Sequence, residues 1–109
     1  MSKAYGAEPT RDEVDRMPGP VLLEFGADWC GFCQALAPHV EALLQHFAQV
    51  RHIKVADGRG QPLGRSFRVK LWPNLVFLRD GQLVQQSARP TIDEVRQGLE
   101  AITQENSPG

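Results

Sequence analysis

Hydrophobic residues along the first half of the chain form a strand-like run, a long helical stripe and a second strand-like run. Residues Val21–Ala27 are almost continuously apolar, which is typical of a buried central strand. Apolar residues then recur at helical spacing and predict a helix from residue 31 to about residue 49, kinked at Pro38. Residues His52–Ala56 predict a second strand, which runs parallel to the first because a helix connects the two.

The second half of the chain predicts a hairpin followed by a closing helix. Leu75–Leu78 is a short apolar strand, and the Asp80-Gly81 pair after it is a strong hairpin signal, with Leu83–Ser87 as the antiparallel partner. Two capping boxes mark helix starts. One, from Thr10 to Glu13, opens a short first helix, and the other, from Thr91 to Glu94, opens the last helix.

This order of elements predicts an α/β fold with a central mixed sheet of four to five strands and helices on both faces. A chain of 109 residues has the length of one domain with one hydrophobic core. We therefore expect a single domain over residues 1–109, with loose ends at residues 1–9 and 104–109. A short edge strand around Ala4 and Tyr5 is the most order expected in the first of these ends.

Composition and charge narrow the classes of function. The net charge of −1 offers no basic surface for nucleic acid or for an anionic membrane, and no apolar stretch reaches the length of a membrane span. The segment Met1–Pro20 lacks the apolar core of a signal peptide. The two cysteines are closer together than is usual for a structural disulfide of a secreted protein. These features favour the cytoplasm, and a monomer is the default expectation.

The cysteine pair, Cys30 and Cys33, lies where the first strand ends and the long helix begins. The unpaired N–H groups at a helix N-terminus favour a thiolate, and the thiolate is the nucleophile. We expect Cys30 to be partly exposed at the start of the helix and Cys33 to lie one turn further on the same face, within reach of a disulfide. This arrangement predicts that Cys30 attacks a partner's disulfide and that Cys33 resolves the mixed disulfide.

Two structural interpretations compete with redox chemistry. One takes the cysteines as half of a zinc site that His39, His46 or His52 would complete, but His39 and His46 lie too close to Cys33 for the usual finger spacing. The other takes them as a chance pair of buried cysteines. A Cys-x-x-Cys pair beside a strand–helix–strand pattern favours the redox interpretation. We therefore expect no metal and assign the three histidines to the surface.

The residues around the pair resemble the thioredoxin family. Trp29-Cys30-Gly31-Phe32-Cys33 is similar to the thioredoxin motif Trp-Cys-Gly-Pro-Cys, and the likeness extends from about Val21 to the last helix. The resemblance implies the thioredoxin fold and a thiol–disulfide oxidoreductase that reduces disulfide-containing proteins. It also implies electrons from an NADPH-dependent thioredoxin reductase and no bound cofactor beyond the redox-active cysteine pair.

Two alternative functions stay open at this point. One is a glutaredoxin-like reductase that uses glutathione. The other is a thioredoxin-fold binding module or chaperone whose cysteine pair is idle. The presence of Trp29, both cysteines and Pro73 together favours the reductase over the binding module.

The resemblance assigns contact roles to the residues around the cysteines. Trp29 would shield the thiol and offer a flat apolar surface, and Pro73 would be a cis proline that faces the cysteines. The backbone of Trp72 would then be free to pair with an incoming peptide as an added strand. Gly31 and Phe32 complete the expected substrate-binding residues.

Glu24 is the third candidate catalytic residue. The alternation of the strand allows it to point to solvent. Thioredoxins, however, carry a buried aspartate at this position that takes the proton from the resolving cysteine. The resemblance therefore implies that Glu24 accepts the proton of Cys33. Thioredoxins have a lysine near this carboxylate that Lys54 could match, but the alignment there is ambiguous and we expect Lys54 to be a solvated strand lysine.

Several positions depart from the family pattern. Phe32 replaces a proline, Trp72 replaces a small or branched residue, and Gly26 replaces a tryptophan or similar bulk, which opens the floor of the site. Near Ser87-Ala88-Arg89, thioredoxins carry a glycine that lets a partner approach closely, and this chain has none there. We expect these changes to alter the partner groove, including the docking of thioredoxin reductase, and we expect Arg89 to be solvated.

Overall fold

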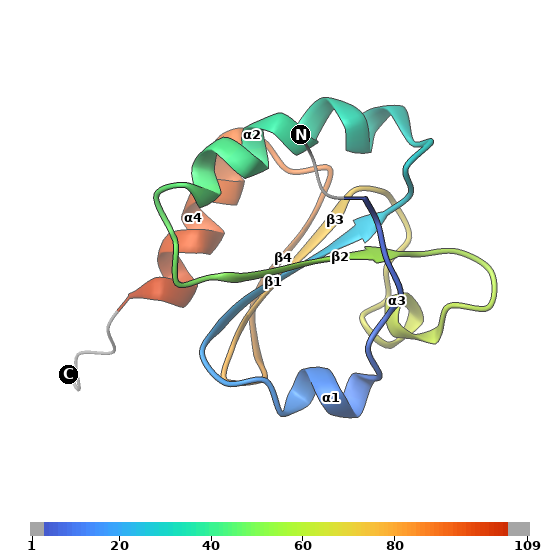
Figure 1. Cartoon of the computed structure of the whole chain (residues 1–109), viewed down its shortest axis with the longest axis horizontal. Helices are drawn as coiled ribbons and strands as arrows, with labels where there is room; N and C mark the ends of the chain where they lie inside the picture. The colour runs from blue at the N-terminus through green and yellow to red at the C-terminus, as the bar shows by residue number, and fades with distance from the viewer. Residues whose placement is uncertain (1–3, 105–109) are drawn as a thin grey trace.

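The architecture is that of a four-stranded mixed sheet, in a computed structural model that describes residues 4–104 (Figure 1). Strand β1 (Pro20–Gly26) lies between β2 (Arg51–Ala56), to which it is parallel, and β3 (Asn74–Arg79), to which it is antiparallel. Strand β4 (Gln82–Ala88) pairs antiparallel with β3 at the other edge. The sheet order β2-β1-β3-β4 confirms the predicted crossover and hairpin.

Helices cover both faces of this sheet, as Figure 1 shows. Helices α2 (Gly31–Leu44) and α4 (Ile92–Thr103) lie on one side, and the short helices α1 (Arg11–Asp15) and α3 (Pro62–Ser66) lie on the other. The expected capping boxes are present at the N-termini of α1 and α4.

Helix α2 is shorter than the sequence pattern predicts. The pattern extends to residue 49, yet the helix ends at Leu44. The chain then continues in tight turns, in which His46 N–H donates to Leu43 O at 2.9 Å and Phe47 N–H donates to Leu44 O at 3.0 Å. These turns keep apolar side chains against the sheet without continuing the helix, which is why periodicity alone placed the end too late.

The alternation of side chains along β1 divides the core in two. Val21, Leu23 and Phe25 pack with residues of α1 and α3, whereas Leu22 packs with residues of α2 and α4. Because successive side chains of a strand point to opposite faces, Glu24 lies on the same face as Leu22. The carboxylate of this strand is therefore directed toward α2, the helix that carries the cysteines.

The described part of the segment before α1 is held against the sheet at Gly6, beside the short edge strand expected around Ala4 and Tyr5. Gly6 forms a parallel bridge with Val55, in which Gly6 N–H donates to Lys54 O and Ala56 N–H donates to Gly6 O, each at 3.0 Å. Figure 1 shows this segment crossing the C-terminal end of the edge strand β2 before it reaches α1. The contact is a single bridge rather than a fifth strand. The expected tail at residues 105–109 lies outside the described residues.

The hairpin between β3 and β4 follows its sequence signal. Asp80 and Gly81 both have positive φ, of 50° and 77°, as the mirror-image turns of tight hairpins require. In the part of the chain that the structure describes, no helix is long and apolar enough to cross a membrane.

Gly98 provides a test of the packing between α4 and the sheet. A Cβ atom at this position would lie 2.6 Å from ring carbons of Phe77, a fully buried residue of β3. We expect Gly98→Ala to lower the free energy of unfolding by about 1–3 kcal/mol, as overpacking does. This expected loss is the net change. It already includes the gain of about 1 kcal/mol that alanine otherwise gives over glycine inside a helix. Denaturant unfolding measures the change.

The control for this substitution is Gly31→Ala, also in a helix, where no atom outside the neighbouring residues and the backbone of the same helix lies within 4 Å of the added Cβ. We expect it to leave the free energy of unfolding unchanged or to raise it by up to about 1 kcal/mol. A Gly98→Ala protein as stable as the unmodified chain would contradict the packing described for α4.

Candidate redox site at the start of helix α2

Cys30 is the N-cap residue of α2. Its Sγ atom accepts a hydrogen bond from the backbone N–H of Cys33 at 3.3 Å, and both cysteines are unpaired thiols. Cys33 lies one turn inside the helix, where the sequence places it. Cys30 is less exposed than expected: 7% of its surface is accessible, against 1% for Cys33. The side chains of Ala27, Tyr5 and Trp72 pack around the pair and cover it.

The environment of Cys33 disfavours its ionisation. Burial raises the pKa of the Cys33 thiol to about 11, and the hydrogen bond and charge of Cys30 act in the same direction. Hydrogen bonds from the backbone of Ala27 and from the hydroxyl of Tyr5 oppose this increase. Cys33 is therefore a protonated thiol near neutral pH, and it needs a proton acceptor before it can act as a nucleophile.

Two tryptophans form an apolar rim beside Cys30. Trp29 is 76% exposed and meets Trp72 edge to face, with ring centroids 5.5 Å apart. The indole N–H of Trp72 donates to Asp57 Oδ2 at 2.8 Å, which fixes the orientation of this ring. A cavity of about 370 Å³ opens beside Cys30 between these rings and Phe32. Such a surface suits an apolar stretch of another protein.

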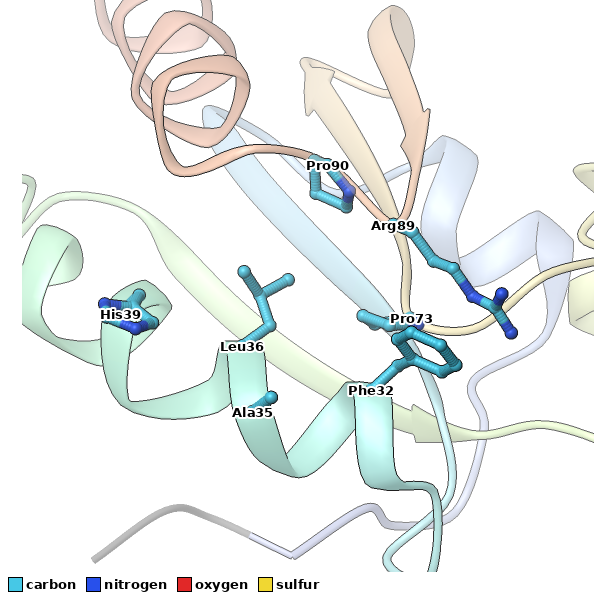
Figure 2. A pocket seen from close by; sticks show the side chains of 7 residues that line it. All are labelled: Phe32, Ala35, Leu36, His39, Pro73, Arg89 and Pro90. Carbon is cyan, nitrogen blue, oxygen red and sulfur yellow. The ribbon is translucent and has the colours of Figure 1, made fainter.

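The peptide bond between Trp72 and Pro73 is cis, as the family resemblance implies. Pro73 is buried at the floor of a second cavity of about 210 Å³, which Phe32 and Leu36 of α2 also line (Figure 2). Phe32 on α2 and Trp72 and Pro73 before β3, all predicted to bind substrate, therefore lie together at the site.

Arg89 is exposed, as expected of a solvated arginine, but its side chain is held against this surface. Its Nε–H donates to the carbonyl oxygen of Trp72 at 2.8 Å, and its guanidinium carbon lies 3.9 Å from the centroid of the Phe32 ring. Figure 2 shows the side chain reaching from the loop after β4 to Phe32. The expectation that the Trp72 backbone is free therefore needs correction, because its carbonyl group is occupied.

Glu24 is buried, with 1% of its surface exposed, which excludes the solvent-facing alternative. Its Oε2 atom accepts from the hydroxyl of Tyr5 at 2.9 Å, and its Oε1 atom lies 2.8 Å from Nε2 of His52. Each carboxylate oxygen thus has a partner, as a buried carboxylate requires.

Two residues of β2 lie at the site although the sequence analysis placed them at the surface. The side chain of His52 is 7% exposed and contacts Glu24. Lys54 is 8% exposed, and its Nζ atom lies 4.3 Å from the centroid of the Tyr5 ring. The parallel pairing of β1 with β2 aligns Lys54 with Glu24, and this register is not visible in the sequence. His39 and His46, by contrast, are exposed as expected.

Tyr5 is the residue of the site that sequence reasoning missed. It is the only tyrosine of the chain, but it lies in a polar segment far in sequence from the cysteines. The one available signal was Gly26, which leaves room where the family carries a large side chain. Within residues 4–104, no group of three or more histidine, cysteine, aspartate or glutamate side chains could hold a metal ion.

Comparisons with known proteins agree with this geometry. The thioredoxin family model matches residues 6–101. Thioredoxin Asp f 28 of Aspergillus fumigatus is 34% identical over 86 residues, which cover 78% of this chain and 80% of that relative. The structure of thioredoxin 2 from Pseudomonas aeruginosa in its reduced form is 47% identical with a TM-score of 0.82, and the match covers 94% of this chain and 96% of that one.

A mutant thioredoxin from Halobacterium salinarum is similar over almost the whole chain as well. It is 30% identical with a TM-score of 0.75, and the match covers 95% of this chain and 93% of that one. The family model spans most of the chain and includes both cysteines. The chain therefore belongs to the thioredoxin family and is a thioredoxin-type thiol–disulfide oxidoreductase with a Cys30-x-x-Cys33 pair.

Proposed function

We propose that this protein reduces disulfide bonds in other proteins, with Cys30 as the attacking cysteine and Cys33 as the resolving one. The position of Cys30 carries this proposal: its sulfur caps α2 and accepts the N–H of Cys33 at 3.3 Å. The partial positive charge at a helix N-terminus favours a thiolate on this atom. Cys33 is deeper and protonated, which suits the second step rather than the first.

The reaction then proceeds by two thiol–disulfide exchanges. The Cys30 thiolate attacks a sulfur of the partner's disulfide, and one partner sulfur leaves as a thiolate. Cys33 loses its proton to Glu24 and attacks Cys30, which closes the Cys30–Cys33 disulfide and releases the second partner sulfur. The partner gains two electrons and the cysteine pair loses two.

Electrons to restore the dithiol come, in this proposal, from an NADPH-dependent thioredoxin reductase. No flavin or nucleotide motif is present in the sequence, so a separate protein must supply them. We place the protein in the cytoplasm, because a reductase of this type needs a compartment that keeps its cysteine pair reduced. We propose that it acts as a monomer without nucleic acid or membrane partners.

The partner is proposed to bind as an added strand along the segment before Pro73, with Trp29 and Phe32 as apolar contacts. The Trp72 carbonyl must exchange its hydrogen bond with Arg89 for one with the partner. Arg89 thus acts as a cover that a suitable partner displaces. The displaced guanidinium then lies beside the peptide, where an acidic side chain can pair with it.

Reduction of insulin tests the function directly. We expect turnover with NADPH and thioredoxin reductase as the electron source and little turnover with glutathione and its reductase. Rapid turnover with glutathione alone would favour the glutaredoxin-like alternative. Absence of insulin reduction from either source, with the cysteine pair intact, would favour a binding module with an idle pair.

The roles of the two cysteines predict which variant traps a partner. In Cys33→Ser the first exchange still occurs but the resolving thiol is absent, so mixed disulfides with Cys30 should accumulate. Mass spectrometry of peptides from trapped complexes identifies the sulfur that holds the partner. Cys30→Ser is the matched control and should trap none. Partner proteins trapped on Cys33 in the Cys30→Ser variant would overturn the roles assigned to the two cysteines.

The cover formed by Arg89 predicts a change in partner binding. Arg89 has a φ of +47°, so glycine fits its backbone. Arg89→Gly should lower the KM for a protein disulfide such as insulin by roughly fivefold, the equivalent of about one hydrogen bond lost from the free protein. Arg16→Ala, at an exposed position, removes the same charge elsewhere and is the control. A raised KM would show that Arg89 contributes binding energy instead.

A further inference from the structure

The hydroxyl of Tyr5 lies between the resolving thiol and the buried carboxylate. It donates a hydrogen bond to Glu24 Oε2 at 2.9 Å, and the tyrosine packs against Cys33, whose thiol pKa it lowers. A tyrosine hydroxyl has one proton to donate and can accept hydrogen bonds on the same oxygen. It can therefore accept from the Cys33 S–H while it donates to Glu24.

Gly26 makes room for this contact. A Cβ atom on Gly26 would lie 2.6 Å from Cys33 Sγ and 2.8 Å from Tyr5 Oη, so both atoms occupy the space that a side chain at this position would fill. The Tyr5 backbone is held by its N–H, which donates to Asp28 Oδ1 at 3.1 Å. The bridge between Gly6 and Val55 fixes the next residue to the sheet.

We propose that Tyr5 relays the proton of Cys33 to Glu24 during resolution. This inference rests on the proposed roles of Cys33 as the resolving thiol and Glu24 as its base. It adds a residue from the N-terminal segment, and a specific path, to that chemistry.

The relay moves two protons in one step. The proton on Cys33 Sγ passes to Tyr5 Oη while the proton on Tyr5 Oη passes to Glu24 Oε2. The Cys33 thiolate that results accepts a hydrogen bond from the renewed Tyr5 hydroxyl and attacks Cys30 Sγ, and the partner's sulfur leaves as a thiolate. Glu24 afterwards returns its proton to solvent, so Tyr5 ends unchanged.

The surroundings of Tyr5 favour a relay over a free phenolate. Burial and the charge of Glu24 raise the pKa of the Tyr5 hydroxyl far above its usual range, so its proton leaves only as another arrives. The ammonium of Lys54 lies over the ring, and His52 holds the second oxygen of Glu24. His52 also lines a surface cavity of about 260 Å³ with Glu41, which gives the base side of the relay a connection to solvent.

Water offers Cys33 a competing route. A cavity of about 300 Å³ is lined by Tyr5, Asp28, Cys33 and Lys54, so a water molecule there could take the thiol proton without the hydroxyl. The two routes differ in one respect that can be tested. Only the relay needs the oxygen atom of Tyr5.

Tyr5→Phe removes that oxygen and keeps the ring. The reduced protein is mixed with dithiobis-nitrobenzoate, and release of the coloured thiol is followed in two phases: attack by Cys30, then resolution by Cys33. We expect the slowing to be confined to resolution and to be on the order of 10- to 100-fold near neutral pH, at or below the lower end of what a positioned acid–base group contributes.

The pH profile separates a relay from a packing role. Tyr5 opposes the increase in the Cys33 pKa, so its removal should shift the resolution profile to higher pH, and the variant rate should approach the unmodified rate in alkaline solution. Ser66→Ala, which removes a hydroxyl on the far face of the sheet, is the control and should leave the profile in place. An unshifted profile in Tyr5→Phe would overturn the relay.

Glu24→Gln distinguishes failure of the relay from failure of the proposed function. If Tyr5 and Glu24 act in one path, the double variant should resolve no more slowly than the slower single variant. A slow Glu24→Gln with an unaffected Tyr5→Phe would reject the relay and keep Glu24 as the base. Unaffected resolution in both would reject Glu24 as well, and a mixed disulfide on Cys33 would reject the cysteine roles.

Discussion

The site depends on the burial of the Glu24 carboxylate near the thiol of Cys33. Glu24 is 1% exposed, and a buried carboxylate is tolerated only when its oxygens are hydrogen-bonded. Tyr5 donates a hydrogen bond to one oxygen of Glu24, and Nε2 of His52 lies beside the other. The N-terminal segment and the edge strand β2 therefore each supply a partner for this carboxylate. The same burial places Cys33 where its own ionisation is unfavourable. The buried carboxylate and the buried thiol are thus separated by a single hydroxyl group, that of Tyr5.

The two cysteines are made unequal by their depth in α2. Cys30 caps the helix and faces the apolar rim, whereas Cys33 is enclosed by the sheet. In the proposed mechanism, attack and resolution are therefore separated in space as well as in time. On the outer side, Arg89 ties the carbonyl of Trp72 to the ring of Phe32 and reduces the groove that a partner can enter. In the proposed mechanism, selectivity toward partners depends on this rim, and proton transfer depends on the buried residues.

Most of the scaffold could be predicted from local sequence patterns. The apolar run Val21–Ala27, the two capping boxes and the Asp80-Gly81 turn each specify a backbone conformation through contacts within a few residues. The cysteine pair follows β1 directly, so its position at the start of α2 was also local. The end of α2 was placed too late, because turns can keep the same apolar side chains buried.

The sequence by itself determined the order of elements, the dithiol and its place at a helix N-terminus, since these depend on neighbours along the chain. Only the tertiary structure decided what surrounds the dithiol. Tyr5 reaches Glu24 across 19 residues, and Arg89 reaches Trp72 across 17. His52 contacts Glu24 through the register of β1 with β2. Such contacts depend on which segments the fold brings together, and no periodicity along the chain records them.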